Sequence, residues 1–114
     1  MGKCLFCRIA AGEIESSKVY EDDEVLAFND INPQAPVHVV VIPKKHIASL
    51  NEVEVGDSDL FGNLFLKVKK TAELLNLDKN GYRVVANCGE DGGQTVGHVH
   101  FHLLGGRSLK WPPG

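Results

Sequence analysis

The sequence predicts an α+β fold in which a roughly five-stranded antiparallel sheet packs against one long helix and a short N-terminal helix. Short runs of β-branched and aromatic residues recur along the chain, and one long segment has the spacing of a buried helix stripe. That helix does not alternate regularly with the expected strands, which argues against a doubly wound parallel sheet. A length of 114 residues fits a single domain over residues 1–114.

The N-terminal part of the chain is expected to contain a short helix followed by three strands. Gly12 ends the helix, Asp22-Asp23 supplies a hairpin turn, and Pro43 ends a valine-rich run that suits a central strand. The expected elements are a helix over residues 4–10 and strands over 19–20, 25–28 and 37–42.

The C-terminal part is expected to contain the long helix, two further strands and an irregular tail. Asp57 or Ser58 can cap the helix, and Asn80-Gly81 turns the chain into the next strand. A glycine-rich loop then leads into a strand that carries three histidines. The expected elements are a helix over about 59–75, a strand over 82–87 and a tail over 105–114. The expected buried helix stripe is Leu60, Phe61, Leu64, Phe65, Val68, Ala72 and Leu75, with Leu66 and Leu77 off it.

Charge and cysteine content exclude several classes of partner. The chain carries 12 Lys and Arg against 15 Asp and Glu, a net charge of −3, which gives no basic field for nucleic acid. No run approaches the roughly 18 apolar residues of a membrane span, so no membrane partner is expected. The three cysteines, in a chain without an export signal, favour reduced thiols or a metal site and a cytoplasmic location.

Three histidines at alternate positions carry most of the functional information. On a strand, His98, His100 and His102 share one face while the residues between them point into the core. A purely structural role is disfavoured, because neighbouring imidazoles repel each other when both are charged. A His-x-His pair can bind a metal, but on a straight strand His98 and His102 are about 13–14 Å apart, too far for one ion to bind all three.

Two of the three histidines can still share an ion, and the third interpretation is nucleophilic catalysis at phosphorus. A neutral imidazole can attack phosphorus with one nitrogen while its other N–H donates to a fixed acceptor. His100, with a histidine on either side, is the natural nucleophile, and His102 can hydrogen-bond a phosphate oxygen or the leaving group. Backbone N–H groups around Gly93 and the side chains of Gln94 and Thr95 can hold the other phosphate oxygens.

A second motif lies near the N-terminus. Cys4 and Cys7 form a CxxC pair, which is half of a tetrahedral zinc site. A redox function is the alternative, but the motif precedes no βαβ unit. The remaining zinc ligands must come from distant parts of the sequence, and Cys88 is assigned no role.

Several motifs occur in order along nearly the whole chain. Residues 98–104 read His-Val-His-Phe-His-Leu-Leu, and residues 111–114 read Trp-Pro-Pro-Gly. The other segments are 21–23, 27–31, 33–36, 41–47 and 91–94. Together they resemble the histidine triad (HIT) superfamily, and more narrowly its Hint branch of histidine triad nucleotide-binding proteins, which act as purine nucleoside phosphoramidases.

The resemblance implies a HIT-like fold and a hydrolase that cleaves the P–N bond of purine nucleoside 5′-phosphoramidates, with an AMP- or GMP-type nucleotide as substrate. By this resemblance His100 would attack the α-phosphorus and form a nucleotidyl-histidine intermediate, with His102 and His38 as its neighbours. Asp30 would accept hydrogen bonds from the ribose hydroxyls. The other implied contacts are Asn87, Gln94 and Thr95 at the scissile bond and Phe6, Ile9, Phe28 and Ile31 at the purine.

The resemblance also implies a structural zinc and a homodimer. His46 and His98 would complete the zinc site with Cys4 and Cys7, and no catalytic metal is implied. The long helix and a strand would pair the two subunits. Trp111 in the tail would then influence substrate choice in the neighbouring subunit.

Two other functions remain compatible with the sequence. One is a dinucleoside polyphosphate hydrolase of the same superfamily, against which the Hint-like tail argues. The other is a non-catalytic module that binds a nucleotide or a partner.

Three residues depart from the common Hint pattern: Thr95 replaces a serine, Asn29 a histidine and Gly97 an aromatic residue.

Overall fold

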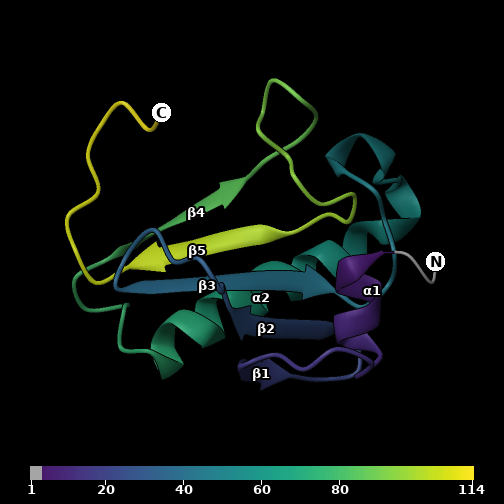
Figure 1. Cartoon of the computed structure of the whole chain (residues 1–114), viewed down its shortest axis with the longest axis horizontal. Coiled ribbons are helices and arrows are strands. Elements are labelled where there is room, and N and C mark those ends of the chain that lie inside the picture. The colour runs from purple at the N-terminus through teal and green to yellow at the C-terminus, as the bar shows by residue number, and fades with distance from the viewer. Residues whose placement is uncertain (1–3) are drawn as a thin grey trace.

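The structure, a computed structural model that describes residues 4–114, is built on one antiparallel sheet (Figure 1). Helices α1 (Leu5–Ala10) and α2 (Ser58–Leu74) lie on opposite faces of the sheet, and 3₁₀ turns over Leu50–Glu52 and Val55–Asp57 precede α2. The strands are β1 (Lys18–Glu21), β2 (Val25–Asn29), β3 (Val37–Pro43), β4 (Tyr82–Ala86) and β5 (Phe101–Gly105). Their spatial order is β1-β2-β3-β5-β4, so the expected α+β class and the five strands are confirmed.

The β1–β2 hairpin forms at the acidic turn that the sequence predicted. Asp22 Oδ1 accepts hydrogen bonds from the backbone N–H groups of Glu24 and Val25, both at 2.8 Å, and this Asx-type turn reverses the chain. β2 then pairs with β3, which is flanked on both sides by other strands. The valine-rich β3 is accordingly buried, as a central strand is expected to be.

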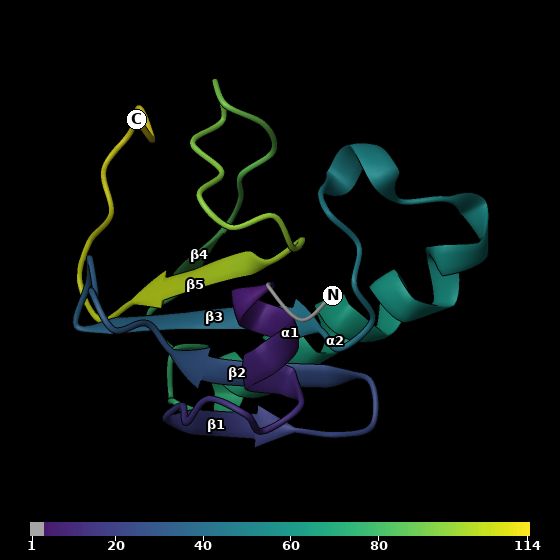
Figure 2. The ribbon, with the colours of Figure 1, turned by 45° about the vertical axis from the view of Figure 1, so that its right-hand side comes forward.

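Alternation along the strands divides the apolar side chains between two cores, one on each face of the sheet. Figure 2 shows α1 and α2 on these two faces. The core beneath α1 consists of Phe6, Ile9, Leu26, Phe28, Val40 and Ile42. The core beneath α2 consists of Val25, Ala27, Val39, Val41, Leu64, Val68, Ala72, Leu77, Phe101 and Leu103. His102 is paired with Val40, so it lies on the α1 face.

α2 buries a narrower stripe than its periodicity predicted. Its buried residues are Leu64, Val68, Thr71 and Ala72. Phe65, expected within the stripe, is 53% exposed, although its ring lies 5.0 Å from that of Phe101. Thr71 is buried because its hydroxyl donates to the carbonyl of Lys67 at 2.7 Å within the helix.

Within residues 4–114, neither the length nor the hydropathy of any helix is sufficient for a membrane span.

Two expectations at the ends of α2 are corrected. Leu77 is 5% exposed and belongs to the α2 core, because the chain folds back after the helix and brings Leu77 against Gly105. Asp57 does occupy the N-cap position, but its carboxylate makes no capping bond to the helix. It accepts instead from Lys45 Nζ at 2.7 Å and from the backbone N–H of Glu54 at 2.9 Å.

The last strand is shorter than predicted, because it begins at Phe101 and not before His98. The pairing of β5 with both β3 and β4 ends at Phe101. Ahead of it, the backbone N–H of Val99 donates to the carbonyl of Ile47 at 2.6 Å. Of the three histidines, only His102 lies within β5.

Candidate active site and metal cluster

His38 and His102 lie side by side on the α1 face of the sheet. The β3–β5 register pairs His38 with Leu104 and Val40 with His102, so both imidazoles project from adjacent strands to the same side. His38 Nε2 is 2.9 Å from His102 Nδ1 and 3.5 Å from a carboxylate oxygen of Asp30. The three side chains form one connected polar network.

The hydrogen bonds of His38 assign the protons of both imidazoles. The backbone N–H of Gln34 donates to His38 Nδ1 at 3.1 Å, so in the neutral ring the proton is on Nε2. His38 Nε2–H therefore donates to His102 Nδ1. Neutral His102 then carries its own proton on Nε2, as an N–H donor available to a substrate.

His100 has the opposite tautomer for a local reason. Its Nδ1 lies 2.7 Å from the backbone carbonyl of His98, and because a carbonyl only accepts, Nδ1 carries the proton. In the neutral ring, Nε2 of His100 therefore holds the lone pair, which is the state that a nucleophile requires. The ring centroids of His100 and His102 are 5.0 Å apart. A lone-pair nitrogen and an N–H donor thus belong to neighbouring rings.

Burial keeps His102 neutral. The pKa of His102 is lowered to about 4, mainly because burial removes the ring from water. The charges of His100 and His38 lower it further, and Asp30 raises it slightly. Asp30 is itself oriented by the backbone N–H of Asn32, which donates to Oδ1 at 2.8 Å. The donor state of His102 is therefore maintained at neutral pH.

Asp30, His38 and His102 also satisfy the proximity expected of metal ligands, with their atoms within 4.8 Å of one another. Their geometry is that of a hydrogen-bonded network. The nitrogen–nitrogen distance is 2.9 Å, whereas two imidazoles on one tetrahedral zinc are about 3.3 Å apart. The N–H of Gln34 donates to Nδ1 of His38, so the proton of the neutral ring is on Nε2. Nε2 is the nitrogen that faces His102 and that would have to bind a shared metal.

The residues expected around the purine are only partly clustered. Phe6, Ile9 and Phe28 are buried together beneath α1, and Phe6 meets the His100 ring edge-on at a centroid distance of 5.1 Å. Ile31 is fully exposed, at 101% of its reference area. Trp111, in the tail, is 81% exposed.

Gln94 braces the glycine-rich loop. Its Oε1 accepts from the backbone N–H of Gly89 at 3.0 Å, and its Nε2 donates to the carbonyls of Ala48 and Val96 at 2.8 and 2.9 Å. These bonds join the loop to the segment after β3 and to the start of the histidine row. The amide of Gln94 is therefore directed at backbone groups.

Asn87 adds a second brace within the same loop. Its Nδ2 donates to the carbonyl of Gly92 at 2.6 Å. Gly93 has a φ of +79°, a left-handed conformation that favours glycine. Gly93 and Thr95 are both exposed, and their backbone and hydroxyl groups are accessible to a ligand.

Cys4, Cys7, His46 and His98 come together from three separate segments. Cys4 caps α1 and Cys7 lies within it, whereas His46 follows β3 and His98 precedes β5. Their four ligand atoms all lie within 4.8 Å of one another. The structure thus joins the N-terminal CxxC to two histidines as expected from the resemblance.

The distances within this cluster fit a tetrahedral ion. Cys7 Sγ lies 3.2 Å from His46 Nδ1 and 3.6 Å from His98 Nδ1, and the two nitrogens are 3.3 Å apart. Ligands on one tetrahedral zinc are about 3.3–3.6 Å apart for such pairs. Two thiolates and two imidazoles are also a donor set that zinc prefers.

The protonation of the cluster fits the same interpretation. His98 Nε2 lies 2.8 Å from the carbonyl of Pro43, so its proton is on Nε2 and its Nδ1 lone pair faces the cluster. Burial is the main cause that lowers the pKa of His98. Burial, followed by the hydrogen bond and charge of Cys4, raises the pKa of Cys7 to about 11. A bound cation would stabilise the thiolates that burial disfavours.

The groups that set histidine protonation were missed by the sequence analysis. They are the N–H of Gln34 and the carbonyls of His98 and Pro43. Every residue except proline carries both a backbone donor and an acceptor, so no sequence signal marks the ones that matter. Cys88 lies outside the cluster.

Comparisons of the sequence and the fold with known proteins find HIT proteins. The profile of the HIT domain matches residues 11–109. An uncharacterised HIT-like protein of Synechococcus elongatus is 54% identical over 110 residues, which cover 96% of each chain. A HIT family hydrolase from Legionella pneumophila superposes with a TM-score of 0.96 at 54% identity, over 98% of this chain and 100% of that one. A histidine triad nucleotide-binding protein from Candida albicans superposes with a TM-score of 0.83 at 38% identity, over 96% of this chain and 83% of that one.

Proposed function

The chain belongs to the HIT family, and we propose that it hydrolyses the P–N bond of purine nucleoside 5′-phosphoramidates through a nucleotidyl-His100 intermediate. Its similarity to a HIT family hydrolase supports hydrolysis as the reaction type. One observation carries the proposed mechanism. His100 presents a lone pair on Nε2 while its neighbour His102 presents an N–H donor.

The proposed reaction has two steps. His100 Nε2 attacks the α-phosphorus, the P–N bond breaks, and the amine leaves with a proton taken from solvent, while the Nε2–H of His102 donates a hydrogen bond to a phosphate oxygen. Water then attacks the same phosphorus, the bond to His100 breaks, and the attacking water releases its proton to solvent. The carbonyl of His98, which accepts from His100 Nδ1–H, stabilises the positive charge that develops on the His100 ring.

The nucleotide is proposed to bind across the α1 face. Asp30 would accept from the ribose hydroxyls, beside His38. The purine would lie against Phe6, Ile9, Phe28 and Ile31. Gly93, Thr95 and Asn87 would contact the phosphate, and Gln94 would support the same contacts by holding their loop in place. The sequence departs from the common serine at Thr95, but the hydroxyl is kept.

We assign the four-residue cluster to a structural zinc. Cys4, Cys7, His46 and His98 would hold the ion, which supplies a tether between α1 and the histidine row. His100 and His102 remain outside this donor set and stay available for catalysis. Thiolate ligands persist in a reducing compartment, in keeping with the expected cytoplasmic location.

A homodimer through α2 and β4 would cover the apolar surface on this side. Phe65 and Leu66 of α2 are 53% and 63% exposed. Val84, on the edge strand β4, is 37% exposed and shares their face, because it pairs with Leu103 of the α2 core. Two-fold pairing of such edges protects them and buries the apolar side chains. In this arrangement the tail, with Trp111, would reach the site of the partner subunit.

The proposed function is tested by comparing substrates. Steady-state kinetics would be measured with adenosine 5′-phosphoramidate, guanosine 5′-phosphoramidate and diadenosine polyphosphates. We expect the phosphoramidates to have the higher kcat/KM, and mass spectrometry after alkaline quench to detect a nucleotide adduct on His100. Faster cleavage of the polyphosphates would support the alternative hydrolase. Tight nucleotide binding without turnover of either class would support a non-catalytic binding module.

A further inference from the structure

The irregular tail after β5 is attached to the rest of the molecule by two arginines. Arg83 of β4 donates from Nη2 to the backbone carbonyls of Leu109 and Lys110, at 3.2 and 2.8 Å. Arg107, at the base of the tail, donates to the carbonyl of Gln34 at 3.0 Å. The tail is therefore held at its base and again just before its tryptophan.

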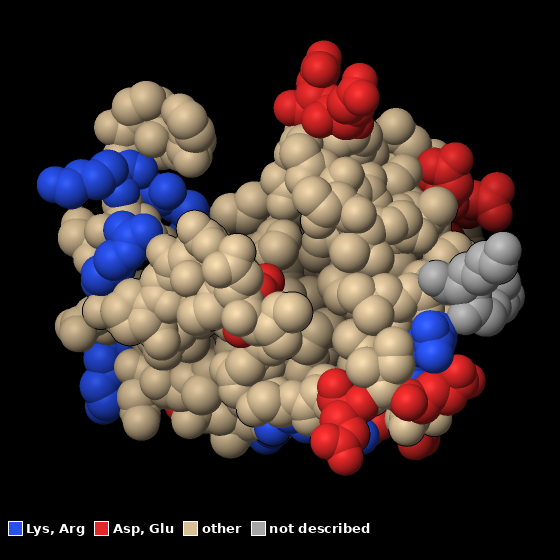
Figure 3. Space-filling model, viewed as in Figure 1, with Lys and Arg blue, Asp and Glu red and all other residues tan. Residues whose placement is uncertain are grey.

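Arg83 lies on the same face of the sheet as the candidate catalytic histidines. The strand register pairs Arg83 with Leu104, and Leu104 with His38 on the next strand. Paired residues project to the same side of a sheet. Lys and Arg gather at this end of the molecule, around the tail, while Asp and Glu gather on the β4–β5 loop and on the opposite side (Figure 3). The second anchor of the tail thus stands on the catalytic face, at a basic edge.

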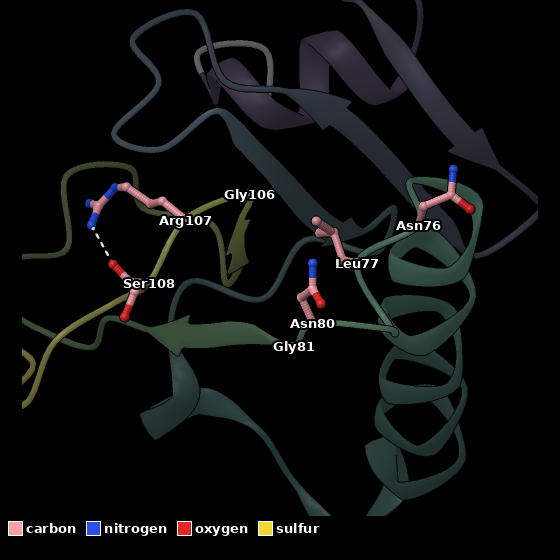
Figure 4. Close-up of a pocket in the computed structure, with 7 residues that line it drawn as sticks. All are labelled: Asn76, Leu77, Asn80, Gly81, Gly106, Arg107 and Ser108. Carbon is pink, nitrogen blue, oxygen red and sulfur yellow. Dashed lines mark hydrogen bonds between the residues drawn. The ribbon is translucent and has the colours of Figure 1, made fainter.

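Little packing holds the tail in place. A cavity of about 400 Å³ lies between its base and the turn after α2, lined in part by Asn80 and Arg107 (Figure 4). A second cavity of about 340 Å³ shares this lining and extends to Arg83. Leu109 is half-buried, but Trp111 is 81% exposed. With so little apolar contact, directional hydrogen bonds determine where the tail lies.

We propose that Arg83 is a positioning residue that places Trp111 for selection of the leaving amine. The inference rests on the proposed function, in which the tail of one subunit contributes Trp111 to the site of the other. Arg83 acts through the tail and does not touch the substrate. One guanidinium nitrogen holds two consecutive carbonyls, which limits rotation of the chain immediately before Trp111.

The first test measures the tail itself. Trp111 is the only tryptophan of the chain, so its fluorescence anisotropy reports on this segment alone. Arg83→Gln should lower the anisotropy, and Arg83→Lys should restore it only in part, because an ammonium lacks the planar guanidinium geometry. Lys110→Gln is the control. It also removes one positive charge from this edge, but it keeps the backbone carbonyl that accepts from Arg83, so the anisotropy should be unchanged. Unchanged anisotropy in a folded Arg83→Gln variant, with folding checked by circular dichroism, overturns the proposal.

The second test measures selection. The kcat/KM ratio for two adenosine phosphoramidates, one of ammonia and one of tryptamine, would be compared among the same variants. Arg83→Gln should change this ratio by roughly tenfold, the change that corresponds to one hydrogen bond from a charged donor. The direction should match that of deleting residues 111–114, and Lys110→Gln should have the wild-type ratio.

The outcomes separate this inference from the proposed function. If the deletion changes the ratio and Arg83→Gln does not, the role of Arg83 is refuted. If the wild-type protein hydrolyses neither phosphoramidate, the proposed function fails, and selection through Arg83 fails with it. In that case the anisotropy measurement still decides whether Arg83 holds the tail.

Discussion

At the scale of single residues, backbone carbonyls give two histidines of one row different chemistry. The Pro43 carbonyl holds the proton of His98 on Nε2, and the His98 carbonyl holds the proton of His100 on Nδ1. In the neutral rings, the lone pair of His98 is therefore on Nδ1, which faces Cys4, Cys7 and His46, whereas the lone pair of His100 is on Nε2. These two identical side chains differ in which nitrogen carries the proton, because their second nitrogens meet different partners.

Replacing His100 by alanine is expected to lower kcat on adenosine 5′-phosphoramidate by about 10³-fold or more, because no other group can form the covalent intermediate. Binding of AMP, measured by calorimetry, should largely persist, since the proposed ribose and purine contacts lie elsewhere. The nucleotide adduct should be absent from this variant in alkaline-quenched mass spectra. Wild-type turnover by His100→Ala would refute the proposed mechanism.

The buried position of His102 also predicts a pH dependence of stability. The pKa of His102 is about 4 in the folded protein and has an ordinary value of 6.5. Between these values the unfolded chain binds a proton that the folded chain does not, so the folded state loses stability as the pH falls from 6.5 towards 4.

Urea unfolding at pH 7 and pH 5 measures this effect. The free energy of unfolding should fall more on acidification in the wild-type protein than in His102→Gln. All other titratable residues are common to the two proteins, so the difference between them isolates His102. Equal losses in both proteins would contradict the assignment.

At the scale of elements, α1 depends on its contacts for stability. It spans only six residues, and isolated helices shorter than about 12 residues are marginal in water. Phe6 and Ile9 bury its inner face against β2 and β3. The cluster of Cys4, Cys7, His46 and His98 joins the same helix to the segments that flank β3 and β5. A metal there would tie three elements that are remote in sequence.

Purified protein is expected to contain about one zinc per chain. Chelation should lower Tm before it lowers kcat, because the proposed ion never contacts the substrate. The Cys7→Ser variant should lose zinc and thermal stability. Cys88→Ser is the matched control, because Cys88 lies outside the cluster, and this variant should keep its zinc and its thermal stability. Folded zinc-free protein that is inactive, and regains activity with zinc but forms no histidine adduct, would favour a metal hydrolase.

At the scale of the whole molecule, apolar side chains are exposed on α2 and on the edge strand β4 within residues 4–114. β4 ends the strand order, and the exposed Phe65, Leu66 and Val84 share the α2 face beside it. A second subunit would cover both features at once.

The protein should sediment as a dimer of about 25 kDa, twice its chain mass of 12.4 kDa. Leu66→Asp should shift the sedimentation profile towards the monomer, because it places a charge in the proposed interface. Val55→Asp is the control, since Val55 is 91% exposed in a 3₁₀ turn outside that face and should leave the dimer intact. A fully active monomer at micromolar concentration would rule out the proposed assembly.

By itself, the sequence determined the class of the fold and most element positions. The strand β3 and the helix α2 were predicted to within about a residue, because the β-branched run and the apolar period are local properties. Local alternation also predicted that His98, His100 and His102 share one face of a strand, although only His102 lies within β5, and the CxxC indicated Cys4 and Cys7 as candidate metal ligands. The resemblance added His46 and His38, which no local pattern indicates.

Only the tertiary structure decided how these residues act. Cys4 and His98 lie 94 positions apart, and the order of the strands brings their ligand atoms to 3.4 Å. The same topology leaves Phe65 exposed and ends the pairing of β5 at Phe101. It also selects the few backbone groups that orient His98 and His100. Periodicity and turn chemistry act over a few residues, whereas tautomers and ligand distances depend on contacts between segments that only the folded chain brings together.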